Sequence, residues 1–300
     1  MTIGDALKQG IALLSDHHIE TPYLDAALLL GDLLHINRSA LIARDRDEIP
    51  QETVDRYIQT ITRRCQGEPV AYLLGRKDFW NLSILVTPAV LIPRPDTEIL
   101  VEAALEFLTG LSVDRPLILD LCTGSGAIAL AVKHDHPQCD LYALDISPQA
   151  ISIAQKNCSL LFPGDIDAIT FFVSDLFSAI ETASPGKIPQ QYHLILANPP
   201  YIPEALIETL SPSVQREPRI ALNGGSDGLA LIRRIVQEAH PFLYPGGALF
   251  LEAQSDQMEI IEGLLTSQGY VELQRNRDLS NQDRVISGKK NKDISFLSHS

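Results

Sequence analysis

Leu117-Ile118-Leu119-Asp120-Leu121-Cys122-Thr123-Gly124-Ser125-Gly126 joins a short apolar run to a turn that contains two glycines. The run 117–121 suits a buried strand, and residues 127–132 after the turn are rich in strong helix formers. A strand, a glycine turn and a helix in succession let a ligand approach the backbone closely. The spacing differs from the dinucleotide pattern G-x-G-x-x-G because residue 129 is Ala, and no Lys-Ser/Thr pair marks a phosphate loop. Alone, the turn is a weak signal.

The next predicted strand ends in an acidic residue. The run 140–144 leads into Asp145, about 20 residues beyond the turn, where a carboxylate can accept hydrogen bonds from both hydroxyls of a ribose. Alternatively, Asp145 only favours the start of the helix expected after Ser147 and Pro148. We adopt the ribose interpretation because the glycine turn precedes it.

A proline-rich corner, Asn198-Pro199-Pro200-Tyr201, follows the apolar run 192–197. Two prolines stop a strand ladder and hold the preceding residue extended, so Asn198 should project with little backbone freedom. Its side-chain oxygen and the Pro199 carbonyl would offer two acceptors to a planar NH2 group, with the Tyr201 ring beside them. The alternative is an ordinary Asn-Pro turn. Beside a nucleoside site without phosphate-binding features, the corner predicts S-adenosylmethionine, with its methyl group facing a nitrogen held by Asn198.

The rest of the chain predicts an α/β protein with a second, helical domain. Strands near 117, 140, 169, 192 and 248 alternate with helices, which is typical of a doubly wound parallel sheet, and strands near 270 and 284 would close it as a hairpin. Apolar stripes in residues 1–75, such as Leu7, Ile11 and Leu14 or Leu24 and Leu28, predict a helical bundle. We expect an extended hairpin linker at 76–93, the main domain at 94–288 and a disordered polar tail at 289–300.

The glycine turn and the proline corner together resemble the class I (Rossmann-like) methyltransferases that modify planar nitrogens. Further segments narrow the resemblance to the PrmC/HemK-type protein-(glutamine-N5) methyltransferases, over residues 3–288. These segments are Gly67-Glu68-Pro69-Val70-Ala71-Tyr72-Leu73-Leu74-Gly75, Leu91-Ile92-Pro93-Arg94-Pro95-Asp96-Thr97-Glu98, Glu217-Pro218 with Ala221-Leu222 and Gly225, Asp227-Gly228-Leu229, and Arg277-Asp278-Leu279 with Asp283-Arg284-Val285.

That family methylates the glutamine of a Gly-Gly-Gln loop in peptide chain release factors, using S-adenosylmethionine. The resemblance implies a catalytic and substrate-binding set of Asn198, Pro199, Pro200 and Tyr201, with Arg94 lining the cleft. It implies a cofactor-binding set of Cys122, Thr123, Gly124, Ser125, Gly126, Asp145, Asp175, Leu176 and Asn198. Arg94 could instead only stiffen the start of a helix, and Asp175 could be a turn residue. The helical domain would dock the partner protein or, alternatively, cap the main domain.

Four positions depart from the family pattern. Cys122, Gln254 and Asn281 stand where glycines are common, and Leu176 is aromatic in some relatives. A thiol is small, so we expect the cofactor still to fit beside Cys122. Apolar contact with the adenine would replace stacking at Leu176.

Composition narrows the classes of partner. The net charge of −14 and the lack of a basic stripe argue against a nucleic-acid substrate. The four cysteines have neither zinc-site nor disulfide spacing, so we predict reduced thiols and no metal. No apolar run approaches the ~20 residues of a membrane span, and no signal peptide is visible. We therefore expect a cytoplasmic monomer.

Three other functions stay open at this point. A nucleic-acid methyltransferase acting on adenine-N6 or guanine-N2 would use the same Asn-Pro-Pro-Tyr logic, with a basic recognition region. A glutamine methyltransferase could have another target protein. A non-catalytic cofactor-binding module could dock a partner through its helices, although Asp145 and Asn198 are both present.

Overall fold

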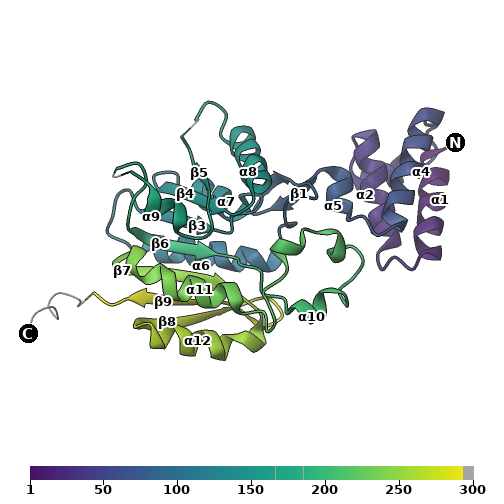
Figure 1. Ribbon diagram of the computed structural model, residues 1–300. Coiled ribbons are helices and arrows are strands. Elements are labelled where there is room, and N and C mark those ends of the chain that lie inside the picture. The colour runs from purple at the N-terminus through teal and green to yellow at the C-terminus, as the bar shows by residue number, and fades with distance from the viewer. Residues whose placement is uncertain (166, 185, 293–300) are drawn as a thin grey trace, which may run out of the picture. The chain divides into compact units, whose positions relative to one another are not determined.

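The computed structural model describes residues 1–165, 167–184 and 186–292 (Figure 1). Two compact units are present. The first comprises Met1–Arg76 with Leu210–Arg216, and the second comprises Lys77–Thr209 with the chain from Glu217 onward. No helix within the described ranges is both long and apolar enough to cross a membrane.

The first unit is the predicted helical bundle. Its helices are α1 (Ile3–Asp16), α2 (Pro22–Leu34), α3 (Arg38–Ala43), α4 (Gln51–Cys65) and α5 (Val70–Leu74). A capping box between Thr2 and Asp5 starts α1. Gly10 of α1 lets the helix approach α4, because a Cβ there would lie 2.1 Å from the Tyr57 hydroxyl. The stripe predicted for α2 is wrong at Leu28, which is 37% exposed, because the alanines of that helix turn toward the core instead.

The second unit is built on a seven-stranded sheet with the order β5-β4-β3-β6-β7-β9-β8. The strands are β3 (Leu117–Leu121), β4 (Asp140–Asp145), β5 (Thr170–Val173), β6 (Tyr192–Ala197), β7 (Leu243–Glu252), β8 (Tyr270–Arg277) and β9 (Asp283–Lys290). The first five in this order pair in parallel, and β9 pairs antiparallel with β7 and β8. The predicted doubly wound methyltransferase sheet with a closing hairpin is confirmed.

Helices cover both faces of this sheet. The longer ones are α6 (Glu98–Thr109), α7 (Ala127–Asp135), α8 (Pro148–Leu161), α11 (Ala230–Ala239) and α12 (Met258–Ser267); the short α9 (Ser178–Thr182) and α10 (Glu204–Ile207) lie in connections. Successive residues of β7 show the two faces. Leu249 and Leu251 belong to the core beneath α11 and α12, which lie side by side in Figure 1. Phe250 points to the opposite face, where its ring contacts Phe107 of α6 with the ring centroids 5.7 Å apart.

Short 3-10 turns complete the connections. They are η1 (Pro95–Thr97), η2 (Val214–Arg216), η3 (Arg219–Ala221), η4 (His240–Phe242) and η5 (Ser255–Gln257).

The expected hairpin is present as β1 (Arg76–Phe79) and β2 (Leu82–Leu85). Its two turn residues, Trp80 and Asn81, both have positive φ, at 50° and 58°, as a two-residue turn of this type requires. Trp80 is an uncommon residue in that conformation. Its backbone N–H bonds to Glu98 at 2.9 Å and its indole N–H to Asp135 at 2.8 Å, which offsets the strain.

Two sheet boundaries differ from the prediction. Strand β7 begins at Leu243 rather than near 248, because a register shift against β6 accommodates Pro245 and the two glycines after it. Strand β9 runs to Lys290, so the first two residues of the expected tail pair with β8 instead. The remainder of that predicted tail from residue 293 lies outside the described residues.

Candidate active site

A cavity of about 450 Å³ lies at the carboxyl ends of the parallel strands in the second unit. The register aligns these ends: Leu121 pairs with both Leu144 and Ala197, and Ala197 also pairs with Leu251. The residues that follow therefore meet at one edge, where the strand order reverses around β3. Of the predicted site residues, the cavity lining contains Cys122, Gly124, Asp145, Asp175, Leu176, Asn198 and Pro200.

The glycine turn, residues 122–126, has left-handed backbone at three positions. Cys122, Gly124 and Gly126 have φ of 58°, 56° and 83°. Gly126 is also tightly packed, because a Cβ there would lie 3.1 Å from the Ala154 Cβ. Thr123 and Ser125 are buried beneath the turn rather than lining the cavity, and the Thr123 hydroxyl donates to Asp120 at 2.5 Å.

Asp145 is fixed by backbone donors. Its two carboxylate oxygens accept N–H groups from Gly124 and Ser147, each at 2.9 Å. Burial raises the pKa of this carboxyl, and the backbone N–H groups oppose that rise. A carboxylate has about four acceptor sites, so acceptor capacity remains for a ligand hydroxyl at the cavity wall.

Asn157 supports the turn from α8 and was not predicted. It is fully buried; its Nδ2 donates to the Ser125 carbonyl at 2.9 Å and to the Leu85 carbonyl at 3.0 Å, and its Oδ1 accepts the Leu85 N–H at 2.7 Å. One side chain thus ties the glycine turn to the β1–β2 hairpin. The available signal was a polar residue on the apolar face of α8.

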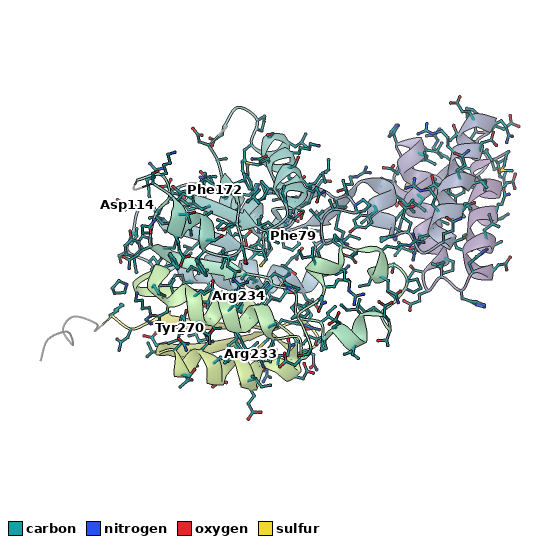
Figure 2. All side chains as sticks on the ribbon, in the orientation of Figure 1. Phe79, Asp114, Phe172, Arg233, Arg234 and Tyr270 are labelled. Atoms are coloured by element: carbon teal, nitrogen blue, oxygen red, sulfur yellow. The ribbon has the colours of Figure 1, made fainter. Side chains whose placement is uncertain are left out.

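The far wall of the cavity carries a charge pair. Asp175 accepts a hydrogen bond from Arg234 of α11 at 3.0 Å, and Figure 2 labels Arg234 beside Arg233. Arg234 is the one cation among the described lining residues. Leu176 is buried with a φ of 47° and gives this wall an apolar surface.

The proline corner, residues 198–201, is held from behind by hydrogen bonds to distant residues. Asn198 Nδ2 donates to the Thr97 hydroxyl at 3.2 Å, and the Tyr201 hydroxyl donates to Glu252 Oε1 at 3.1 Å. No described residue donates to Asn198 Oδ1 or to the Pro199 carbonyl. The two acceptors predicted for a planar NH2 group therefore carry no bond from within the described chain.

Tyr201 and Pro199 lie differently from the prediction. Neither side chain is among those lining the cavity. Pro199 is buried, and the Tyr201 ring packs partly against the sheet core, where burial raises the pKa of its hydroxyl. We therefore assign Tyr201 to holding the corner, because its hydroxyl is committed to Glu252.

Glu252 is a buried acid that was not predicted as a site residue. It ends β7 with 1% of its surface exposed. Burial raises the pKa of its carboxyl to about 7, while the hydrogen bond from Tyr201 to Oε1 acts in the opposite direction; Oε2 is buried without a hydrogen-bond partner among the described residues. The one sequence signal was a charged residue at the end of an apolar strand.

The loop after the corner closes against Tyr201. The Gln257 side chain donates to the Tyr201 carbonyl at 3.0 Å. Gly228 has a φ of 78°, and a Cβ there would lie 2.3 Å from the same carbonyl. Only glycine tolerates both the left-handed backbone and the close approach of this carbonyl, which explains why position 228 is a glycine.

Arg94 does not line the cavity. Its guanidinium pairs with Glu217, whose side chain is buried and whose Oε2 accepts the Ile92 N–H at 2.9 Å. Leu91, at the start of this segment, does line the cavity. The ion pair therefore fixes the segment that places Leu91 in the cavity wall.

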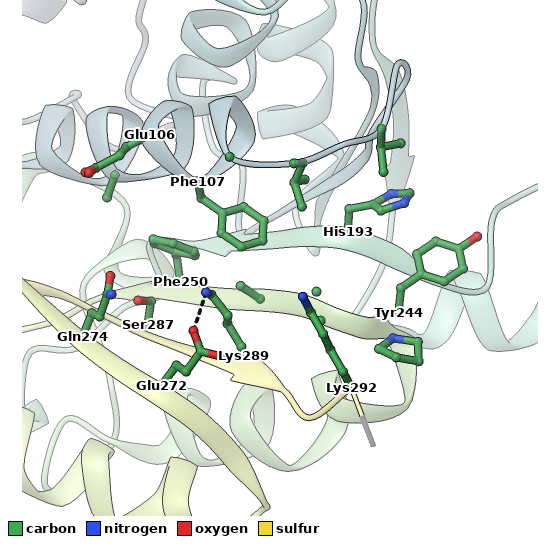
Figure 3. Close-up of a pocket in the computed structure, with 18 of the residues that line it drawn as sticks. Glu106, Phe107, His193, Tyr244, Phe250, Glu272, Gln274, Ser287, Lys289 and Lys292 are labelled. Atoms are coloured by element: carbon green, nitrogen blue, oxygen red, sulfur yellow. Dashed lines mark hydrogen bonds and ion pairs between the residues drawn. The ribbon is translucent and has the colours of Figure 1, made fainter. Parts of the chain in front are cut away.

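A second cavity of about 580 Å³ lies between α6 and the strands β7, β9 and β8 (Figure 3). His193 and Tyr244, near the starts of β6 and β7, line it, so it lies toward the amino ends of the parallel strands. Lys289 in its wall is paired with Glu272 at 2.6 Å. None of the predicted site residues lines this cavity. Within the described residues no cluster of His, Cys, Asp and Glu could hold a metal ion.

Comparison with known proteins gives the family. Residues 5–75 match the model of the PrmC N-terminal domain, and residues 98–210 match that of the methyltransferase small domain. A release factor glutamine methyltransferase of Moorella thermoacetica is 39% identical over 287 residues, covering 95% of this chain and 98% of the relative. This chain belongs to the release factor glutamine methyltransferase family. The Escherichia coli member is 38% identical, over 90% of this chain and 93% of its own.

A solved structure supports the fold of this family member. The catalytic domain of hMettl16, in complex with MAT2A 3′UTR hairpin 6, has a TM-score of 0.56 at 14% identity, covering 79% of this chain and 84% of that one. At that identity, the likeness concerns the fold alone.

The positions where the family commonly has glycine divide into two kinds. Cys122 and Asn281 have left-handed backbone, with φ of 58° and 63°, whereas Gln254 has ordinary extended backbone at φ −74° and ψ 149°. Asparagine tolerates the left-handed region better than most residues. Strain from the missing glycine is therefore concentrated at Cys122.

Proposed function

We propose that this chain transfers the methyl group of S-adenosylmethionine to the side-chain amide nitrogen N5 of the glutamine in the Gly-Gly-Gln motif of peptide chain release factors. The observation that carries the proposal is the proline corner: Asn198 lines the cavity of about 450 Å³, and neither its Oδ1 nor the neighbouring Pro199 carbonyl takes a bond from the described chain. Membership of the release factor glutamine methyltransferase family supplies the target.

The cavity suits the proposed cofactor. Its volume lies within the range usual for small-molecule sites. Asp145 offers acceptors for the ribose hydroxyls, and its carboxylate favours a cation nearby. The one described cation in the lining, Arg234, is paired with Asp175. The described lining therefore offers no unpaired cation that could bind a phosphate. When bound, S-adenosylmethionine would supply an electrophilic methyl carbon.

The protein's part in the reaction is to position a weak nucleophile. An amide nitrogen is unreactive because its lone pair is delocalised into the carbonyl. Two acceptors, Asn198 Oδ1 and the Pro199 carbonyl, would take the two N–H bonds of the glutamine, orient its nitrogen and favour positive charge there. The methylated amide cation would then lose its proton to water, so the site needs no dedicated base.

The remaining assignments complete the proposal. We assign residues 1–75 to docking the release factor, with residues 76–93 as a linker to the catalytic domain 94–288. The acidic balance, with a net charge of −14, favours a protein acceptor over a nucleic acid. We expect a monomer that acts in the cytoplasm, where translation ends.

Labelled cofactor tests the proposal directly. The protein is incubated with methyl-labelled S-adenosylmethionine and purified release factor, and separately with the same factor in which the Gly-Gly-Gln glutamine is replaced. Label on the first factor and none on the second is expected. Equal label on both would contradict the proposed acceptor, and label on added DNA or RNA would favour the nucleic-acid alternative.

A further inference from the structure

The buried amide of Asn157 in α8 commits all of its polar groups to backbone partners. Its Oδ1 accepts the Leu85 N–H at 2.7 Å, and its Nδ2 donates to the Leu85 carbonyl at 3.0 Å and to the Ser125 carbonyl at 2.9 Å. The residue has 0% of its surface exposed, so solvent competes for none of these bonds. One side chain thus holds two backbone segments that are 40 residues apart, since 125 − 85 = 40.

The three partners fix the orientation of this amide. Two of them are carbonyl oxygens, which only accept, and the third is an N–H group, which only donates. An amide turned by 180° would place its oxygen against two carbonyls and its NH2 group against a donor, and all three bonds would be lost. Position 157 therefore requires a side chain with two donor hydrogens and one acceptor oxygen, which asparagine supplies at this size.

On the hairpin side, Asn157 takes the place of a neighbouring strand. It exchanges two hydrogen bonds with the backbone of Leu85, as a paired residue of an antiparallel strand does. The strand β2 belongs to a sheet of two strands, so this amide satisfies polar groups that an edge strand otherwise leaves open. The chain then continues from Leu85 to Ala89, Val90 and Leu91, which line the 450 Å³ cavity.

On the other side, α8 supports the glycine turn through one helical face. Ala154, three residues before Asn157, packs beneath Gly126, where a Cβ would lie 3.1 Å from the Ala154 Cβ. The neighbouring Ser125 carbonyl bonds to Asn157. Gly124, the residue before Ser125, lines the cavity. A shift of the Asn157 amide would therefore move the turn at the cavity wall.

We propose that Asn157 is a positioning residue for the cofactor, which couples the β1–β2 hairpin to the glycine turn and so sets the affinity for S-adenosylmethionine. Asn157 itself is not among the lining residues. Coupling of binding free energies is reciprocal, so the bound cofactor should in turn hold Leu85 in place, although Leu85 does not line the cavity either. The inference rests on the proposed function only through its cofactor, since it holds whichever acceptor receives the methyl group.

Two variants test the effect on affinity. Asn157→Asp keeps the size, but a carboxyl carries at most one hydrogen and cannot serve both carbonyls, and Asn157→Ala removes all three bonds. Both should weaken binding of S-adenosylmethionine, measured by calorimetry, about tenfold, within the range usual for coupled sites. The KM for the release factor should stay near the wild-type value. Gln155→Glu makes the same chemical change at an exposed position of α8 and should bind the cofactor as the wild type does.

Hydrogen exchange of the Leu85 amide separates coupling from a purely structural role. In the wild-type protein, saturating S-adenosylmethionine should slow this exchange several-fold. In Asn157→Ala the Leu85 N–H has lost its acceptor, so it should exchange equally fast with and without the saturating cofactor. A structural role alone would lower stability without making the exchange at Leu85 depend on the cofactor.

Either of two results would overturn the proposal: wild-type cofactor affinity in both variants at position 157, or wild-type exchange at Leu85 that does not respond to the cofactor. If neither variant folds, the exchange measurement on the wild-type protein decides alone. Cofactor binding with the expected response at Leu85 but without methyl transfer to the release factor would support the coupling and count against the proposed function.

Discussion

The glycine turn is held by groups up to 32 residues away in the chain, whereas the proline corner is held by side chains 51 to 101 residues away. In the turn, Thr123 bonds to Asp120 and Gly124 bonds to Asp145, across 3 and 21 residues. At the corner, the bonds to Thr97, Glu252 and Gln257 span 101, 51 and 56 residues. The turn is therefore largely a local structure, while the corner depends on the finished fold.

This difference assigns separate tasks to the two regions. Backbone groups and one carboxylate make up the turn, which suits the binding of a ligand that is the same in every reaction cycle. A side-chain oxygen and a backbone carbonyl, backed by bonds to distant residues, make up the corner, which suits orienting a reacting group. Substitutions at the corner should change kcat, and those at the turn should change cofactor affinity or stability.

Asn198→Ala gives the largest expected effect. Loss of one positioning acceptor should lower kcat roughly 10²–10³-fold, by analogy with the loss of single donors at other sites. Cofactor affinity should stay near the wild-type value, because the turn is intact. Single-turnover kinetics with labelled cofactor measure the first quantity and calorimetry the second. Asn276→Ala, on β8, is the control, and wild-type turnover in Asn198→Ala would remove the distinction between the two regions.

Gly228→Ala tests whether the corner depends on the loop packed against it. The new Cβ would lie 2.3 Å from the Tyr201 carbonyl at a backbone φ of 78°. Strain and overpacking together should lower the free energy of unfolding by about 3 kcal/mol, measured by urea denaturation. The control is Gly263→Ala in α12, where nothing lies within 4 Å, and a gain of up to about 1 kcal/mol is expected there. Equal stability of the two variants would contradict the packing argument.

The pH dependence of kcat distinguishes the two regions through two buried carboxyls. Burial raises the pKa of Glu252 at the corner and that of Asp120 beneath the turn, each to about 7. Ionised Glu252 is the stronger acceptor for the Tyr201 hydroxyl that holds the corner, so kcat should fall up to tenfold per pH unit below that pKa. The fall in kcat below pH 7 should be absent in the Glu252→Gln variant, whereas it should persist in Asp120→Asn. A step that disappears only in Asp120→Asn would reverse the assignment.

Stability should move in the opposite direction to activity. The pKa of Glu252 is raised from an ordinary value of 4.5, so the folded protein holds this proton more tightly than the unfolded chain does. The contribution of Glu252 to the free energy of unfolding is therefore present below pH 4.5 and is lost as the pH rises toward about 7. Urea denaturation of wild type and Glu252→Gln across this range measures it.

The same contrast explains what could be predicted from the sequence. Apolar runs, glycines and prolines carry their information locally, so the strands at 117, 140 and 192, the glycine turn and Asp145 were all predictable. The partners of the corner were not, because no local pattern pairs Thr97 with Asn198 or Glu252 with Tyr201. Their distances in the chain are bridged only when β6, β7 and α6 come together.

Tyr201 shows this limit within a single motif. Its place after two prolines was evident, but its direction depends on Glu252, a residue of another strand. Arg94 is similar, since its partner Glu217 lies 123 residues away. Asn157 was detectable as a polar residue on an apolar helical face, yet its partners Ser125 and Leu85 were not.

The smallest expected effect concerns Cys122, where this chain lacks the glycine common in its family. The residue has a φ of 58°, a conformation that costs a side chain with a Cβ about 1–2 kcal/mol. Cys122→Gly and Cys122→Ala both remove the sulfur, but only the glycine variant removes the strain. The glycine variant should therefore be more stable by about 1 kcal/mol in thermal unfolding, although glycine is ordinarily the less stable choice.

Position 254 is the matched control, because its backbone is extended at φ −74°. There Gln254→Gly should be less stable than Gln254→Ala, by about 0.5–1 kcal/mol, since a glycine gains nothing from its freedom. If the glycine variant is more stable than the alanine variant at position 122 but less stable at position 254, the strain belongs to the turn itself. The same order at both would mean that neighbouring contacts, rather than local backbone conformation, decide the stability of the glycine turn, and the contrast with the proline corner would then fail.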